Sequence, residues 1–257
     1  MCYVYSLAMN RRKFIVSFAL LPTITTARAA PAWSAEFISG GFDGSAYVGG
    51  LHIKLIEGWK TYWRNPGEAG IPPDIQAAQS QNLESIKIEF PLPLRIVDSS
   101  GEAYGYHTDV VLPLRFTPSD LNKPITAHMT SFFGVCAQVC TPAQFEGDVS
   151  FMPRSQISSN EALLAQWLAK VPKLATFATS AEVKDDFLVV TLNQPLDDIF
   201  VEGPERFSFQ KPDFAKEAGK AWIKINGLKN SLSLKGTPVR LTANAAGLGL
   251  EQTITPA

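Results

Sequence analysis

Short runs in which apolar and polar residues alternate dominate the chain from residue 37 to residue 151. SAYVGGLHIKLI (45–56) and SIKIEF (85–90) alternate in this way, and DVVLPLRFT (109–117) and ITAHMTSFF (125–133) continue the pattern, with Gly, Pro and Asp between the runs. A period of two residues is typical of strands that bury one face. Many short strands without intervening helices predict an antiparallel β-sandwich and not a parallel βαβ arrangement.

The period changes from two residues to 3.6 between residues 158 and 170. One face of this segment is apolar and consists of Leu163, Leu164, Trp167, Leu168 and Val171. Ser158 and Glu161 have the spacing of a capping box at a helix start, and Pro172 would stop the helix. The pattern predicts one short helix that separates two β regions.

A second β region follows, from residue 175 to residue 257. AEVKDDFLVVTL (181–192) predicts a hairpin. Further strands are expected in the segments 221–228, 231–236, 239–247 and 248–254. The region contains no cysteine or histidine, and we interpret Asp197, Asp198 and Glu202 as a solvated loop face and not as a ligand cluster. The whole pattern predicts an all-β chain: an antiparallel β-sandwich, a short helix and a second, smaller β-sandwich.

The amino-terminal residues have the composition of an export signal. Met9 opens a basic segment, NRRKF (10–14), and a short apolar run follows it before Pro22. That run is far shorter than the roughly 20 residues that span a bilayer. Ala27-Arg28-Ala29 forms a small-x-small cleavage site before Ala30. We therefore expect cleavage near Ala29 and Ala30, export to an oxidising compartment and no direct membrane insertion of the mature chain.

The charge of the chain limits its partners. The precursor has 23 Lys and Arg against 24 Asp and Glu, and without the leader it has 19 basic against 24 acidic residues, a net charge of −5. Such a surface does not attract phosphate backbones or anionic lipids, so we expect no nucleic-acid partner. Arg11 and Arg12 fit a twin-arginine (Tat) signal, but ordinary Sec signals also carry arginine pairs, so the sequence leaves the export route open.

Two cysteines remain in the mature chain, Cys136 and Cys140, because Cys2 lies in the leader. On one extended strand their Cα atoms would lie about 13 Å apart, whereas a disulfide needs about 7 Å or less. The apolar residues around them favour strand over helix. We therefore expect a tight hairpin with residues 137–139 at its tip, which brings the Cα atoms to about 4.5–5.5 Å. This loop contains no Gly or Asn to take a positive φ.

Three functions of this pair are compatible with its spacing: a redox-active dithiol, an inert clasp, or a two-thiolate clip for Cu(I). A clasp around so short a loop removes little entropy from the unfolded chain. The thioredoxin motif differs, because it has two residues between its cysteines. His128 would lie about 27 Å from Cys136 along an extended strand, so it cannot share a metal site with the cysteines.

Three stretches carry a family resemblance. They are EGWKTYWRNPGEAGIPP (57–73), FPLPLRIVDSSGEAYGYHTDVVLPLRF (90–116) and VCAQVCTPAQ (135–144). In order and spacing they resemble the amino-terminal periplasmic domain of the thiol:disulfide interchange protein DsbD, in particular its ScsB-like branch. The resemblance implies a periplasmic protein whose first domain is an immunoglobulin-like sandwich. The expected segments are a signal peptide (1–29), a redox domain (30–155), a helical linker (156–174) and a second β domain (175–257).

The resemblance also implies a function in thiol–disulfide interchange, as a protein-disulfide reductase without a cofactor or a metal. In the family, the domain takes electrons from a membrane electron-transfer protein of DsbD or CcdA type. It passes them to periplasmic thioredoxin-like proteins, among them disulfide isomerases and cytochrome c maturation factors. The alternative is a non-enzymatic module for copper tolerance or partner binding, in which Cys136 and Cys140 bind Cu(I) or form a structural disulfide.

The resemblance assigns roles to residues by position. Cys140 matches the cysteine that forms the mixed disulfide with partners, and Cys136 matches the resolving cysteine. The family shields its cysteines with a flexible cap loop, and Ala103 stands where better-known members have the covering aromatic residue. We therefore expect the shielding to come from Tyr104 or Tyr106, or to be weaker. The expected cap and flanking residues are Glu102, Ala103, Tyr104, Gly105 and Tyr62.

Overall fold

The computed structural model describes residues 31–67, 70–98, 101–154, 159–227 and 231–257. Ala32–Ala257 form one compact unit. Within the described ranges the strands form four sheets around two large hydrophobic cores. The predicted signal peptide and its cleavage site lie outside the described residues, as does Ser158 of the predicted capping box.

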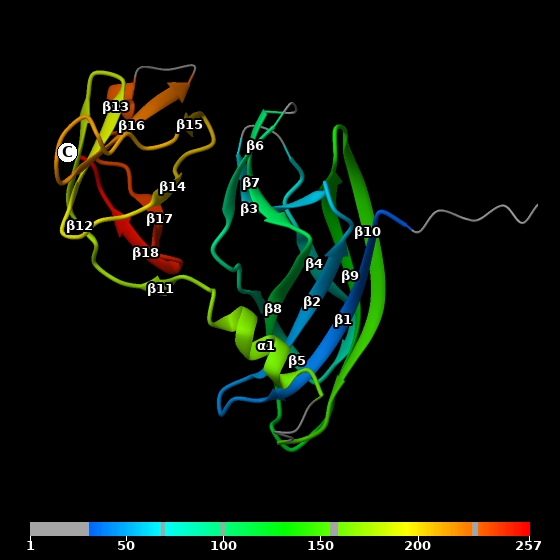
Figure 1. Cartoon of the computed structure of the whole chain (residues 1–257). Helices are drawn as coiled ribbons and strands as arrows, with labels where there is room; N and C mark the ends of the chain where they lie inside the picture. The colour runs from blue at the N-terminus through cyan, green and yellow to red at the C-terminus, as the bar shows by residue number, and fades with distance from the viewer. Residues whose placement is uncertain (1–30, 68–69, 99–100, 155–158, 228–230) are drawn as a thin grey trace, which may run out of the picture. The chain divides into compact units, whose positions relative to one another are not determined.

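Two antiparallel sheets form the first half of the chain (Figure 1). One has the order β1-β2-β8-β5, formed by β1 (Trp33–Phe42), β2 (Tyr47–Leu55), β8 (Asp109–Pro118) and β5 (Leu83–Ile88). The other has the order β10-β9-β3-β7-β6, with β4 paired to β9, and is formed by β10 (Cys140–Phe151), β9 (Ile125–Cys136), β3 (Lys60–Gly67), β7 (Gly101–His107), β6 (Leu94–Asp98) and β4 (Asp74–Gln81). The sandwich predicted from the alternation is present.

Apolar residues from both sheets meet in the first core. Its largest fully buried apolar side chains include Leu51, Leu112, Phe116, Trp63 and Phe133. Each such side chain contributes about 1.5–3 kcal/mol when it leaves water. The core therefore fixes the register of β9, which carries Cys136, with its neighbour β3.

The strand β9 changes its burial pattern toward the end that carries Cys136. From Ile125 to Phe133, alternate residues face the core, as expected for a sheet with one solvated face. The last four residues, from Phe133 to Cys136, are all buried. The outer face of the sheet is therefore covered at this end, and Gly134 and Cys136 lie beneath the cover.

The predicted helix forms as α1 (Glu161–Leu168) and is shorter than expected. Its N-cap residue is Asn160, which makes no side-chain cap bond. Ser158 of the predicted capping box lies outside the described residues. Leu164 is buried against the first sandwich, where a β-carbon at Gly40 or Gly50 would crowd it. Within the described residues, no helix is long and apolar enough to span a membrane.

The second β region consists of two further sheets around the second core. One has the order β11-β18-β17-β14, formed by β11 (Lys173–Leu174), β18 (Leu248–Ile254), β17 (Val239–Ala245) and β14 (Asp198–Glu202). The other has the order β12-β13-β16-β15, formed by β12 (Ala178–Lys184), β13 (Phe187–Leu192), β16 (Lys220–Gly227) and β15 (Phe207–Phe209). The all-β class and the order of β-sandwich, helix and second β region are confirmed.

Two details of this region differ from the sequence-based expectation. The segment 231–236 does not form a strand: Ser231–Leu234 form the 3-10 helix η1. Leu232 is 48% exposed whereas Leu234 is buried, so the two leucines do not share one buried face as they would in a strand. Asp198 and Glu202 belong to β14 and not to a solvated loop.

Candidate functional site

Cys136 and Cys140 face each other across the hairpin of β9 and β10. Cys136 ends β9, Cys140 begins β10, and the two are direct partners in the antiparallel register. Directly opposed Cα atoms lie about 4.5–5.5 Å apart, which is within the reach of a disulfide. Residues 137–139 close the turn, and none of them has a positive φ. The loop therefore needs no Gly or Asn to bring the two thiols together.

The two thiols differ in their access to solvent. Both are free, but Cys136 is 1% exposed whereas Cys140 is exposed. Val139, next to Cys140 at the hairpin tip, is 75% exposed. A protein that docks at this tip can therefore reach the sulfur of Cys140 without any rearrangement, and cannot reach that of Cys136.

The cysteines lie on the outer face of their sheet. Cys136 pairs with Lys60 of β3, and Lys60 pairs with His107 of β7. Directly paired residues project to the same side of a sheet, so His107, Lys60, Cys136 and Cys140 form one row across four strands. Val135, which precedes Cys136, points into the first core instead. Thiol chemistry at this row is thus separated from the core by the sheet itself.

Tyr62 and Ala103 cover Cys136. The three residues form a small buried cluster of their own, and Tyr62 is 2% exposed. The ring of Tyr62 fits between two glycines. A β-carbon at Gly134 would lie 2.7 Å from Cε2 of the ring, and one at Gly70 would lie 2.5 Å from Cδ1 and Cε1. The two glycines therefore form the slot that holds the tyrosine over the buried thiol.

The phenol of Tyr62 interacts with both cysteines. Burial raises the pKa of Tyr62 far above its usual value of 10.0, and hydrogen bonds with Cys140 and Cys136 raise it further. The phenol is therefore neutral at any physiological pH and available as a hydrogen-bond donor. Because a thiolate is a good acceptor, this donor lies where a negative charge develops during thiol–disulfide exchange.

Lys60 brings a buried cation into the cysteine row. It is only 2% exposed, and its Nζ lies 2.7 Å from Oδ2 of Asp98 at the end of β6. Sequence reasoning missed this residue. The available signal was a lysine within WKTYW (59–63), a segment whose aromatic residues predict a buried strand. The ion pair connects β3, beside Cys136, to the edge strand β6.

The segment predicted as a cap loop is the regular strand β7. It pairs with β3 on one side and with β6 on the other. Ala103 lies with Cys136, and Gly105 lies opposite Tyr62, where a β-carbon would be 2.0 Å from the carbonyl oxygen of Thr61. Tyr104 belongs to the first core. The shielding of Cys136 thus comes from Tyr62 and Ala103.

The other aromatic and acidic cap residues have different partners. Tyr106 lies in the first core and donates a hydrogen bond from its hydroxyl to the carbonyl of Pro91. Like Tyr104, it does not lie in the cluster around Cys136. The expectation that Tyr104 or Tyr106 shields the cysteine is therefore corrected. The carboxylate of Glu102 binds the guanidinium of Arg95 on β6.

The described residues offer few additional metal ligands. None of them form a group of three or more His, Cys, Asp or Glu side chains suited to a metal ion. His128 pairs with Asp148 eight residues before Cys136 on the same hairpin, and His107 is exposed, with Nδ1 near the carbonyl of Trp59. A Cu(I) ion at Cys136 and Cys140 would thus have two thiolates from the part of the chain described here.

Residues 27–148 match the protein family described as thiol:disulfide interchange protein DsbD, N-terminal. The matched range contains the cysteine hairpin, Tyr62 and all of β7. The first β region is a DsbD N-terminal-like domain. The match implies a role in thiol–disulfide interchange for this region, and the free cysteine pair lies within the matched range.

One solved structure extends the comparison beyond the first β region. The crystal structure of the N-terminal periplasmic domain of ScsB from Proteus mirabilis aligns with a TM-score of 0.70 at 18% identity, over 89% of this chain and 95% of that one. It therefore shares the fold of the DsbD N-terminal-like domain and of the second β region. The reduced DsbD N-terminal domain of Neisseria meningitidis aligns at 16% identity with a TM-score of 0.27, over 48% and 90% of the two chains. No curated protein sequence matches the chain.

Proposed function

We propose that this protein exchanges disulfides with other periplasmic proteins and relays electrons to them through Cys136 and Cys140. The observation that carries the proposal is the asymmetry of the pair: two free, directly opposed thiols, of which one is exposed and one is 1% exposed. An inert clasp needs no such difference. A relay needs this difference in exposure, because its exposed thiol has to react with a partner while its second thiol stays protected until the resolving step.

The proposed reaction proceeds in two exchange steps. The thiolate of Cys140 attacks a sulfur of the acceptor's disulfide, forms a mixed disulfide and releases the acceptor's other sulfur as a thiolate. The thiolate of Cys136 then attacks the sulfur of Cys140, which forms the Cys136–Cys140 disulfide and releases the second acceptor sulfur. The acceptor gains two electrons and, with two protons, becomes a dithiol. The Cys136/Cys140 dithiol loses the same two electrons and two protons, and is oxidised to the disulfide.

The surroundings of the cysteines support these roles. The hydroxyl of Tyr62 can donate a hydrogen bond to either sulfur, so it stabilises whichever thiolate is present. Tyr62 and Ala103 exclude partners from Cys136. The buried thiol is therefore kept for the resolving step, and Cys140 is the sulfur that enters mixed disulfides.

The partners follow from the family and from the balance of electrons. A separate donor has to reduce the Cys136–Cys140 disulfide after each turnover, and we propose a membrane electron-transfer protein of DsbD or CcdA type. We propose thioredoxin-like proteins of the periplasm as acceptors, of the disulfide isomerase or cytochrome c maturation type. This proposal includes export by the leader, cleavage near Ala29 and Ala30, and the division into a redox domain (30–155), a linker (156–174) and a second β domain (175–257).

The reduction potential of the pair tests the proposed function. We would equilibrate the mature chain with glutathione or dithiothreitol buffers and trap the thiols. A potential near about −200 mV, in the range of relay and isomerase dithiols, is expected. A potential below about −300 mV, the range of structural disulfides, would refute the relay. Anaerobic titration with Cu(I) tests the copper-binding alternative, for which tight one-to-one binding that needs both cysteines is the diagnostic result.

A further inference from the structure

The second β region contacts the DsbD N-terminal-like domain through β14. Phe200 of β14 is 1% exposed and is buried with the first core, not with the second. Its ring centroid lies 5.1 Å from that of Tyr104 on β7 and 5.8 Å from that of Trp63 on β3. β14 thus packs against residues of the two strands that carry the cover of Cys136.

Arg95 of β6 binds both the cap strand β7 and β14. Its side chain is 7% exposed. Its Nε and Nη2 donate to the two carboxylate oxygens of Asp198, at 2.9 and 3.0 Å, and Nη2 also donates to the carbonyl of Ile199. Its Nη1 donates to the carboxylate of Glu102 and to the hydroxyl of Tyr104. One buried guanidinium therefore joins two residues of β7 to β14.

Tyr104 adds a direct contact between β7 and the second region. Its hydroxyl lies 3.1 Å from the carbonyl oxygen of Phe209 and donates a hydrogen bond to it. The guanidinium of Arg95 stacks on the ring of Tyr104 at 4.8 Å and on that of Phe200 at 5.0 Å. Desolvated cation–π contacts of this kind are stronger than exposed ones. The contact is thus both polar and aromatic.

The alternation of side chains along β7 connects the contacts with Arg95 to the cluster around Cys136. Successive residues of a strand point to opposite faces. Glu102 and Tyr104 bind Arg95 on one side of β7, while Ala103 between them lies on the other side, in the buried cluster with Tyr62 and Cys136. Ala103 therefore cannot leave this cluster without disturbing the bonds that Glu102 and Tyr104 make on the other side of β7.

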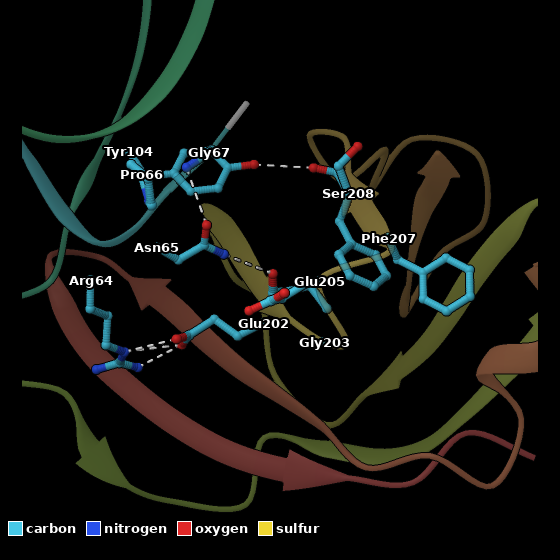
Figure 2. Close-up of a pocket in the computed structure, with 12 residues that line it drawn as sticks. Arg64, Asn65, Pro66, Gly67, Tyr104, Glu202, Gly203, Glu205, Phe207 and Ser208 are labelled. Atoms are coloured by element: carbon cyan, nitrogen blue, oxygen red, sulfur yellow. Dashed lines mark hydrogen bonds and ion pairs between the residues drawn. The ribbon is translucent and has the colours of Figure 1, made fainter. Parts of the chain in front are cut away.

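A second ion pair joins the same two regions without involving β7. Arg64 of β3 donates from Nε and Nη2 to the carboxylate of Glu202, at 2.9 and 2.7 Å, and from Nη2 to Glu251. Figure 2 shows this pair at one side of a cavity of about 640 Å³, with Tyr104 at the opposite side. The cavity interrupts the contact on this side, so β7 is held by the bonds of Arg95 and Tyr104 and by the packing of Phe200.

We propose that the second β region is a latch that holds Ala103 of β7 in the cluster with Tyr62 and Cys136, and so limits access to the buried thiol. The positioning residues are Arg95, Asp198 and Tyr104. The redox meaning of the latch rests on the proposed relay: a partner that displaces β14 would free β7 and uncover the resolving cysteine. The geometric claim, that the contacts of β14 limit exposure of Cys136, is independent of the relay.

The test is the alkylation of Cys136 by iodoacetamide in the mature chain carrying Cys140→Ser, where Cys136 is the remaining cysteine. Asp198→Asn keeps the shape of the side chain and removes the charge that pairs with Arg95. Loss of charged hydrogen bonds favours opening by about tenfold, so we expect alkylation about tenfold faster. The matched control is Glu202→Gln, which removes a charge from the same interface but acts on β3, and it should accelerate alkylation far less.

Two results would overturn the latch: an unchanged alkylation rate in Asp198→Asn, or equal acceleration in Asp198→Asn and Glu202→Gln. If Asp198→Asn lacks a cooperative thermal transition, Tyr104→Phe replaces it, because it keeps the ring and removes the hydroxyl that binds Phe209. Acceleration is expected there too, and its absence overturns the latch. A reduction potential in the range of structural disulfides, combined with accelerated alkylation of Cys136, would refute the relay but support the latch.

Discussion

Gly134 and Tyr62 fit each other so closely that a single added methyl group would separate them. The β-carbon of an alanine at position 134 would lie 2.7 Å from Cε2 of the Tyr62 ring, closer than such carbons approach other atoms. Gly134 precedes Cys136 by two residues on the same face of β9. The glycine therefore determines whether the tyrosine can lie over the thiol.

Gly134→Ala is expected to displace Tyr62 and to destabilise the fold by about 1–3 kcal/mol, the usual range for overpacking. Alkylation of Cys136 should become faster in the same variant, because its cover has moved. Gly147→Ala on the same hairpin is the control, since its β-carbon would come no closer than 3.3 Å to another residue. Urea unfolding and alkylation rates give both readouts. Equal effects of the two variants would contradict the inference that Gly134 makes room for the Tyr62 ring over Cys136.

The two cysteines should behave differently in trapping experiments. With Cys136→Ser, the exposed Cys140 can attack an acceptor's disulfide but nothing resolves the product, so a mixed disulfide should accumulate. With Cys140→Ser, the buried Cys136 should form little or none. Non-reducing electrophoresis with a thioredoxin-like acceptor measures both. An adduct on Cys136 alone would reverse the assigned roles.

Tyr62→Phe separates the covering ring from its hydroxyl. The ring remains in its slot, so stability should fall by only about 1 kcal/mol, the contribution of one hydrogen bond. Exchange should be slower, because the attacking sulfur loses a donor that stabilises its negative charge. Rates of disulfide exchange with glutathione at fixed pH report the difference. An unchanged rate would limit Tyr62 to a covering role.

Stability should decrease in alkaline solution. Burial raises the pKa values of Tyr62, Tyr104 and Tyr106 above 10.0. Below pH 10 the folded and unfolded chains hold the same phenol protons, so the stabilising difference is fully present. As the pH rises above 10, the unfolded chain releases protons that the folded chain retains, and the free energy of unfolding falls by at most about 1.4 kcal/mol per pH unit for each tyrosine.

The variant Tyr106→Phe tests this pH dependence. Urea unfolding between pH 9 and pH 11.5 should show a shallower loss of stability than in the unchanged protein, because one retained proton is missing. A small loss at neutral pH is expected as well, since the bond from the Tyr106 hydroxyl to Pro91 is removed. Identical slopes for the two proteins would show that Tyr106 does not contribute.

The sequence predicts the hairpin of Cys136 and Cys140 because the information is local. The separation of the cysteines excludes a disulfide along a single strand, and the apolar residues around them favour strand over helix. The cover could not be predicted in the same way. Tyr62 and Ala103 join Cys136 in one cluster because β3 pairs with both β7 and β9, and this pairing depends on packing between segments far apart in the chain.

Asp198 and Glu202 illustrate the same limit. Along the chain they look like ordinary solvated carboxylates, because nothing near them in sequence offers a partner. Their partners are Arg95 and Arg64, more than 100 residues earlier. Lys60 was missed for a related reason: its aromatic neighbours in the sequence indicate a buried strand, but the carboxylate that pairs with it, Asp98, lies 38 residues away.

The position of Phe200 has a consequence for how the protein folds. A residue from the second half of the chain completes the core of the first half, so neither core is whole until both halves have formed. Folding intermediates with only the first half structured would expose parts of Trp63 and Tyr104. The two halves should therefore melt together, in one cooperative transition, although the strands of each are arranged as a separate pair of sheets.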